Sequence, residues 1–237
     1  MVDKQSLSSA HHDWTGVTIP EFTQQPVVMQ VRGEWACFTR PEFNSERVSY
    51  PIMTPSAAVG LLSSVFWKPQ FRWVIEAIDV LSPLKWITMR RNEVANPIGL
   101  QPKSNTMRRG YLDASQEIQQ RMTLMLRDVH YRIFAHIWVH PRAEEQNPAK
   151  WRDQARRRID RGQVFRTPFL GMREFHADVG PSDSSPAVDW TEDLGLMLHS
   201  IHVDSKGVET YDWFDARVIQ GRMPVPCRGF QRDGDSS

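Results

Sequence analysis

The stretch VHYRIFAHIWVHPRAEEQNPAKWRDQARRRIDRG (129–162) changes its periodicity halfway along. In residues 129–140, aliphatic residues alternate with His, Arg and larger aromatic residues, which predicts a strand. Asn147 is then a favourable N-cap, Pro148 takes the first helical position and Gly162 follows the last turn, so a helix is predicted between them. The two patterns together predict a strand that leads directly into an amphipathic helix.

A second helix and several strands complete the predicted order. The helix spans residues 54–69: Thr54 caps it, Pro55 takes its first position and Pro69 ends it. Residues 113–127 are predicted as a helix, with a strand at their end as the alternative. Strands are predicted over 26–38, 71–81, 84–94, 129–140 and 167–179, followed by a terminal hairpin over 194–203 and 210–225.

This order favours an α+β protein. Strand, helix, strand, strand, helix, strand is the plan of a ferredoxin-like domain, here followed by a C-terminal antiparallel β-sheet extension. We expect a flexible N-terminal extension (1–25), the ferredoxin-like domain (26–179) and a C-terminal β region with a loose tail (180–237). Because such a domain leaves one sheet face free, it suits recognition of single-stranded RNA.

The composition excludes several classes of protein. The chain has no apolar run of about 18 residues, and residues 1–16 lack an apolar secretory segment, so neither a membrane span nor export is expected. Cys37 and Cys227 are far apart, which is typical of free thiols in a reducing cytoplasm. The eight histidines show no metal-ligand spacing, so no metal site and no other cofactor is predicted.

Basic residues are concentrated in a few places although the net charge is +1. Residues 150–166 hold seven Lys or Arg against two Asp, and smaller groups lie at 85–91 and 108–109. On the predicted helix, Lys150 and Arg157 share one face. Such a local group of cations favours phosphate binding, and a solvated helix face is the alternative.

Several uncommon strings occur in order along the chain. They include GEWACFTRPE (33–42), ERVSYPIMTPSAAVG (46–60), NPAKW (147–151) and RRIDRGQVFRTPFLGMREF (157–175). On these strings the chain resembles the CRISPR-associated Cas5 family of subtype I-C, the d or Dvulg type. The resemblance runs from about Gln30 to about Arg222.

The resemblance implies a fold, an activity and partners. The fold is a RAMP-type, RRM-like ferredoxin domain that binds the stem-loop and 5′ handle of CRISPR repeat RNA. Many family members cut the precursor RNA as metal-independent endoribonucleases. They then stay on the 5′ handle inside the Cascade effector complex, beside subunits of Cas7 and Cas8 type. Non-specific binding of duplex DNA through the same basic residues is an alternative.

The RNA phosphates are expected to meet arginines from several parts of the chain. Guanidinium groups match phosphate geometry and also stack on bases. The predicted contact residues are Arg40, Arg47, Arg90, Arg91, Arg108, Arg109, Arg156, Arg157 and Arg161.

The family's cutting site consists of a Tyr in a YWKP string and an adjacent Lys and His in a GKH string. Carried over to this chain, these positions are Phe66, Lys150 and Trp151. Phe66 has no hydroxyl, and the indole of Trp151 donates a hydrogen bond but takes up no proton. Lys150 is still able to stabilise the charge of a phosphorane. Trp151 is expected either to pack in the core or to stack on a base.

Two functions therefore stay open. In the first, the chain is an endoribonuclease that leaves a 2′,3′-cyclic phosphate, with another residue handling the protons. His136, His140, His176 and Tyr50 are the candidates, since a His titrates near neutrality; a packed or surface role is the alternative for each. In the second, it is a catalytically inactive subunit that holds the 5′ handle of a guide processed elsewhere.

Overall fold

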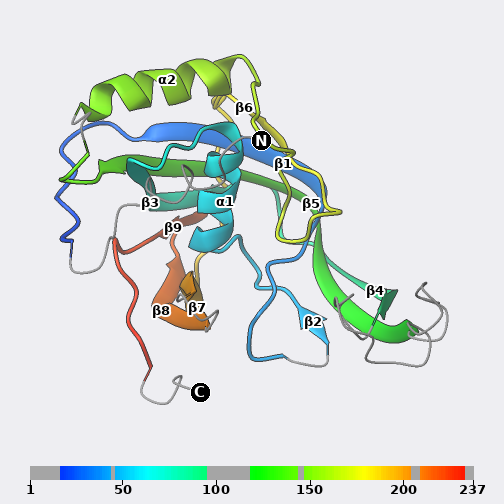
Figure 1. The fold of residues 1–237 in the computed structure, drawn as a ribbon. Coiled ribbons are helices and arrows are strands. Elements are labelled where there is room, and N and C mark those ends of the chain that lie inside the picture. Colours follow the sequence, from blue (N-terminus) through cyan, green and yellow to red (C-terminus); the bar gives the residue numbers. More distant parts are fainter. Residues whose placement is uncertain (1–16, 44–45, 95–117, 144–146, 204–208, 233–237) are drawn as a thin grey trace, which may run out of the picture.

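An antiparallel sheet and two helices make up most of the part of the molecule that the computed structural model describes (Figure 1), namely residues 17–43, 46–94, 118–143, 147–203 and 209–232. The helices are α1 (Pro55–Val65) and α2 (Pro148–Asp160). The strands are β1 (Val27–Ala36), β2 (Arg47–Val48), β3 (Phe71–Val80), β4 (Trp86–Val94), β5 (Ile118–Val139), β6 (Asp178–Gly180), β7 (Glu192–Val203), β8 (Glu209–Val218) and β9 (Arg222–Pro224). No helix in these ranges is long and apolar enough to cross a membrane. The two helices and nine strands of the described ranges confirm the α+β class.

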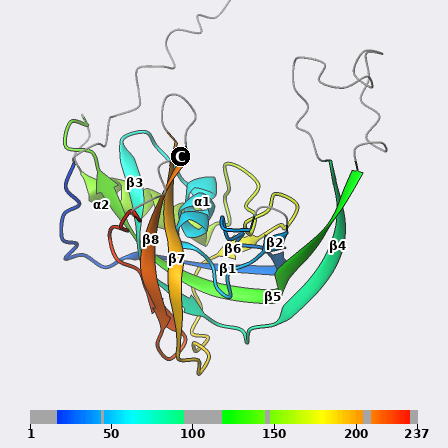
Figure 2. The same cartoon turned by 90° about the horizontal axis from the view of Figure 1, so that it is seen from below.

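The 22-residue strand β5 organises the main sheet. Its second half pairs with β1 and β3, and the order along the sheet is β6-β1-β5-β3-β9 with antiparallel neighbours. Its first half pairs with β4 and, in parallel, with the short β2. Asp128, with a φ of 53°, lies between the two halves. β4 and the first half of β5 project from the body as an arm (Figures 1 and 2).

The helix predicted over 113–127 is wrong where the structure describes it, because residues 118–127 belong to β5. Gln, Arg, Met and Leu in this segment favour a helix by propensity. Continuous pairing with β4, from Trp86↔Leu126 to Val94↔Ile118, overrides that preference. The alternative prediction, a strand at the end of this segment, is confirmed.

The strand predicted over 167–179 is also wrong, because only Asp178 and Val179 of it lie in a strand, β6. Before β6 the chain folds back on itself, and the backbone N–H of Leu170 donates to the carbonyl of Phe175 at 2.8 Å. Gly171 has a φ of 81°, and a Cβ there would lie 1.9 Å from the carbonyl oxygen of Cys37. A glycine in this conformation permits a close approach of two backbones that a strand would not make.

Both helices begin as their capping residues predict. The Thr54 hydroxyl accepts from the backbone N–H of Ala57 at 3.2 Å, and the Asn147 side chain accepts from that of Ala149 at 3.0 Å. Each helix buries an apolar stripe in one common core with the sheet. The stripes are Ala58, Leu61, Leu62 and Val65 of α1 and Trp151, Ala155 and Ile159 of α2.

The face of the main sheet that points away from α1 and α2 was predicted to be free for single-stranded RNA, but other segments of the chain contact it. The ring of Phe22 stacks on that of His136, with centroids 4.4 Å apart and planes within 3°. Arg132 donates to the hydroxyl of Ser182 at 2.8 Å and to the carbonyl of Ser185 at 2.7 Å. Residues before β1 and after β6 therefore cover much of this face.

The C-terminal residues form a hairpin and then return to the main sheet. β7 and β8 make a separate two-stranded sheet close to the predicted positions, and α1 packs against β7. β9 then pairs with β3, where Arg222 donates to both carboxylate oxygens of the buried Asp79, at 2.6 and 3.0 Å. Within the hairpin the register shifts between Leu198 and Ser200, so His199 lies in an irregularity of the strand.

Candidate functional site

Phe66 and Trp151, which the resemblance places at the family's Tyr and His positions, lie in a buried cluster of aromatic rings. Phe66 caps the C-terminal end of α1 and is 3% exposed, and Trp151 in the first turn of α2 is 8% exposed. Their ring centroids lie 6.1 Å apart, and the ring of Phe71 lies 5.4 Å from Phe66 and 6.2 Å from Trp151. Of the two roles expected for Trp151, the structure has core packing. Its indole N–H has no hydrogen-bond partner within the described residues.

Lys150 is the exposed member of the three inherited positions. Its ammonium lies 5.4 Å from the ring centroid of Trp151, within the range of a cation–π contact. The adjacent Trp therefore holds the charge of Lys150 at the outer surface of the ring cluster. The arrangement offers a positive charge to an anion, but the buried rings provide no group that exchanges protons.

Tyr50 and His140, two of the predicted proton handlers, are buried. Tyr50 is 2% exposed, and its hydroxyl accepts from the backbone N–H of Leu198 at 3.3 Å. Burial raises the pKa of Tyr50 to about 12, so the phenol stays protonated near neutrality. His140 is also 2% exposed, and its Nδ1 accepts from the backbone N–H of Arg142 at 3.1 Å. Neither ring reaches the surface where RNA would lie.

His136 and His176 differ sharply in their surroundings. His136 is buried, and its Nε2 lies 2.6 Å from a carboxylate oxygen of Glu76, under the ring of Phe22. His176 is exposed in the turn before β6, where its backbone pairs with Phe169. Among the four residues predicted to replace the lost proton handlers, His176 is thus the accessible one.

The predicted phosphate contacts fall into separate groups. On α2, Arg157 and Arg161 are exposed, while Arg156 donates to the carbonyl oxygens of Gln25 and Pro26 at 3.2 and 3.3 Å. This bond fixes the segment before β1 against the helix. The exposed guanidinium groups of α2 form the larger part of a cationic surface.

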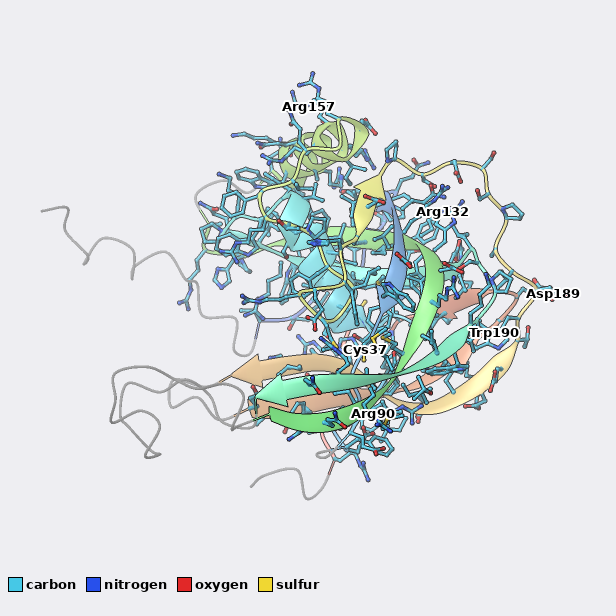
Figure 3. All side chains as sticks on the ribbon, turned by 90° about the vertical axis from the view of Figure 1, so that its right-hand side faces the viewer. Cys37, Arg90, Arg132, Arg157, Asp189 and Trp190 are labelled. Carbon is cyan, nitrogen blue, oxygen red and sulfur yellow. The ribbon has the colours of Figure 1, made fainter. Side chains whose placement is uncertain are left out.

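A second group lies on the arm, at the opposite end of the molecule from Arg157 (Figure 3). Arg90 is exposed there, whereas Arg91 forms an ion pair with Glu174 and stacks over the ring of Phe175 at 5.6 Å. Arg91 therefore fastens the arm to the turn before β6. The predicted basic residues do not make one continuous stripe.

The remaining predicted contacts lie between these groups or cannot be placed. Arg40 stacks over the ring of Tyr50, 4.8 Å from its centroid, and Arg47 is half-buried in β2. Arg108 and Arg109 lie outside the described residues. Arg40 and Arg47 support the loop that leads into α1.

A polar cluster that was not predicted from the sequence lies in a cavity between α1, β3 and the β7–β8 hairpin. It consists of His199, Ser200, His202 and Asp212. In a regular strand, His199 and His202 would point to opposite faces, because three is an odd separation. The shift in register at His199 brings both side chains to the cavity, as β-bulges commonly do. The paired histidines in HSIH (199–202) were the available signal.

No group of three or more His, Cys, Asp or Glu side chains that could hold a metal ion occurs in the described ranges.

The sequence has relatives whose names state an activity. One is "CRISPR pre-crRNA endoribonuclease Cas5d" of Thermus thermophilus, 38% identical over 86% of this chain and 92% of the relative. Another, of the same name from Mannheimia succiniciproducens, is 37% identical over 84% of this chain and 93% of the relative.

Solved structures show the same fold at low sequence identity. A crystal structure of a CRISPR-associated protein has a TM-score of 0.64 at 19% identity and covers 86% of this chain and 93% of its own. A functionally uncharacterized protein from Streptococcus mutans has a TM-score of 0.60 at 22% identity, with the same coverage.

The family described as "CRISPR-associated protein (Cas_Cas5)", in its Cas_Cas5d form, matches residues 27–226. This range includes both helices, the whole main sheet and the terminal hairpin. The chain therefore belongs to the Cas5 family of CRISPR-associated proteins, in its d type.

Proposed function

We propose that this chain binds CRISPR repeat RNA and cuts the precursor as a metal-independent endoribonuclease. The observation that carries the proposal is the similarity, at 37–38% identity, to two proteins named pre-crRNA endoribonucleases over 84–86% of this chain and 92–93% of theirs. The family match over residues 27–226 includes both helices, their caps and the main sheet, which together position the surface that would meet RNA.

The cationic surface of α2 supports binding to the RNA backbone. Lys150, Arg157 and Arg161 are exposed on a helix whose opposite side is buried in the core. Positive charges held in this way attract phosphates, and the resulting affinity falls as salt concentration rises. We propose that this surface binds phosphates of the repeat RNA, and that Arg90 on the arm binds a different part of the same RNA.

A ferredoxin-like fold of the RAMP type belongs to the same proposal. In such a fold the four strands of the two βαβ units lie in the order 4-1-3-2, with antiparallel neighbours. The strands β1, β3, β5 and β6, numbered along the chain as the first to fourth, have the order β6-β1-β5-β3. The position of α1 between the first and second of them, and of α2 between the third and fourth, supports it further.

Cleavage without metal has three chemical requirements. The 2′-hydroxyl loses a proton, the negative phosphorane is stabilised, and the leaving 5′-oxygen gains a proton. Lys150 is proposed to supply the electrostatic stabilisation. The exposed His176 is the first candidate for proton transfer among the residues predicted from sequence, whereas Tyr50, His136 and His140 are buried.

A handle-binding subunit without cutting activity is the second candidate function. It is favoured by Phe66 and Trp151, which are buried against one another where the family has its Tyr and His. In either case we propose that the protein remains on the 5′ handle in a type I-C effector complex with Cas7-type and Cas8-type subunits, in the cytoplasm where the transcript is made. Binding of duplex DNA through the same arginines is the less specific alternative.

The test is a cleavage assay in EDTA on 5′-labelled repeat RNA from the protein's own CRISPR locus, run beside a binding gel. A single EDTA-resistant cut is expected, and Lys150→Ala should slow it by about 10²-fold while binding persists. Arg217→Ala, which removes an exposed cation of β8 outside every predicted contact group, is the control. Intact RNA at micromolar excess of a protein that binds it would replace this proposal by the handle-binding subunit.

A further inference from the structure

The cavity beside α1 adjoins the inherited site. It encloses about 820 Å³, a size within the range of about 300–1,000 Å³ that small-molecule sites occupy. Phe71 lines the cavity and also contacts the rings of Phe66 and Trp151. Trp67, the residue after Phe66, forms part of the wall. Phe71 is therefore shared by the cavity wall and by the ring cluster that Lys150 adjoins.

A chain of hydrogen bonds runs along one wall. Nε2 of His202 lies 2.7 Å from a carboxylate oxygen of Asp212, and the Ser200 hydroxyl donates to the same oxygen at 3.1 Å. Nδ1 of His199 lies 3.0 Å from that hydroxyl, and its Nε2 lies 2.9 Å from the carbonyl oxygen of Pro226. Each member of the chain comes from β7, β8 or the segment after β9, so the hairpin holds it together.

The direction of these bonds fixes which nitrogen of His202 accepts a proton. An ionised carboxylate only accepts hydrogen bonds, so Asp212 keeps the proton of a neutral His202 on Nε2. The other nitrogen, Nδ1, is then the basic one, on a side chain that is 50% exposed. A carboxylate that orients a histidine in this way is the arrangement of a general base in nucleophilic catalysis.

The other walls carry groups that a nucleotide uses. Trp67 is 46% exposed and presents an aromatic surface, on which a base of any sequence stacks. Arg72 and Arg228 also line the cavity, and Arg228 donates to the carbonyl oxygen of Val17 at 2.7 Å. Aromatic and cationic side chains therefore lie in the same cavity as the His202–Asp212 pair.

We propose that this cavity binds the ribonucleotide at the cut and that His202, oriented by Asp212, is the general base for its 2′-hydroxyl. The inference rests on the proposed endoribonuclease function and names the residue that would replace the family's lost proton handlers. Asp212 is a positioning residue, because it acts through His202. Lys150, beside the ring cluster whose Phe71 also lines the cavity, keeps its proposed role of stabilising the phosphorane.

The proposed step conserves all atoms. The O2′ proton moves to Nδ1 of His202, the O2′–P bond forms and the P–O5′ bond breaks. The O5′ oxygen takes a proton, returned by the His202 imidazolium directly or through solvent water. The products are a 2′,3′-cyclic phosphate and a 5′-hydroxyl, and no water, oxidant or metal is consumed.

The first test compares single-turnover cleavage in EDTA by the wild type, His202→Gln and Asp212→Asn, with His130→Gln as the control. His130 is a half-buried histidine of β5 bonded to Arg32 and remote from the cavity lining. Loss of a general base should slow His202→Gln by about 10²–10⁴-fold and leave the RNA Kd unchanged. Asp212→Asn should lower the single-turnover rate constant with the RNA Kd unchanged and shift the pH–rate profile, and Asp212→Glu should restore part of the rate.

The outcomes separate this inference from the proposed function. If the wild type binds RNA but does not cut it, the proposed activity fails and the inference fails with it. If the wild type cuts and His202→Gln cuts equally fast, the inference alone is overturned. A His202→Gln protein that binds RNA normally and cuts slowly supports both.

Cys227 gives a second test that needs no change to the network. It is exposed and lines the cavity, whereas Cys37 is fully buried, so a bulky maleimide should react at Cys227. Labelled wild type should lose cleavage at least about tenfold, since a misplaced substrate is costly to rate. Cys227→Ser treated with the same reagent should keep its activity. Equal cleavage by labelled and unlabelled wild type would overturn the inference.

Discussion

The ring cluster of Phe66, Phe71 and Trp151 and the polar network of His202 and Asp212 are neighbouring regions with opposite character. The first is buried and joined by ring contacts, and the second is half-exposed and joined by hydrogen bonds. Phe66 and Trp151 are the two residues that the resemblance places at the family's Tyr and His positions. The difference shows that groups able to exchange protons are present in the polar network and absent from the three rings.

The largest effect is expected from removing the largest ring of the cluster, Trp151. Trp151→Ala should lower the free energy of unfolding by about 3–5 kcal/mol, because a large buried side chain leaves a cavity. Chemical denaturation measures this change. Trp67→Ala is the control, since that ring is 46% exposed, and a surface substitution is expected to cost about 0.5 kcal/mol. A cost for Trp151→Ala as small as the control's would mean that Trp151 is not part of the core.

Restoring the Tyr at position 66 should be less costly to stability, and restoring both residues should not restore a site. Phe66→Tyr places a hydroxyl at a position 3% exposed, which is expected to cost about 1–3 kcal/mol if the hydroxyl finds no partner. With Trp151→His added, cleavage should stay within about twofold of the wild type, because proton transfer is assigned to His202. The EDTA cleavage assay measures it. A rise of tenfold or more would show that the inherited positions still control the rate.

Much of the fold was predictable because local signals and tertiary packing agree. Thr54 and Asn147 cap helices that begin where predicted, and a proline follows each of them. The prediction for the first half of β5 was wrong because pairing with β4 holds its helix-forming residues as a strand. No local pattern in the sequence reveals this pairing. The strand predicted over 167–179 was wrong because the chain folds back at Gly171, against the backbone of Cys37.

The candidate site was predictable in its inherited positions but not in its surroundings. Phe66 and Trp151 were visible in the sequence as departures from the family's strings, and the burial of Trp151 follows from the apolar stripe of α2. The cavity was not visible, because Trp67 and Asp212 are 145 positions apart in the chain and meet only through the packing of the hairpin on α1. The irregularity at His199, which turns two histidines to one side, also depends on pairing with β8.

The polar network should contribute less to stability than the rings do. Ser200→Ala removes the hydroxyl that links Asp212 to His199 and should lower the free energy of unfolding by about 1 kcal/mol, the net value of one hydrogen bond. Denaturation and cleavage are measured on the same preparation. Because Asp212 keeps its bond to His202, cleavage should fall less than in His202→Gln. A stability loss as large as that of Trp151→Ala would place this network in the core and end the contrast.

The smallest effect distinguishes the two regions by their response to pH. Burial lowers the pKa of His199, so the native protein favours the neutral ring, although Asp212 opposes this effect. An unfolded His titrates near pH 6.5, so below that pH the unfolded chain binds a proton that the native chain resists. This contribution therefore lowers stability as pH falls from about 7 to 5. His199→Gln should lose less stability than the wild type across this interval, as measured by denaturation at several pH values.

His130, whose pKa is also lowered by burial, is present in both proteins, so its contribution cancels in the comparison. Parallel stability curves would mean that His199 protonates as easily in the native network as in the unfolded chain, and the aromatic cluster and the polar network would then respond to pH alike.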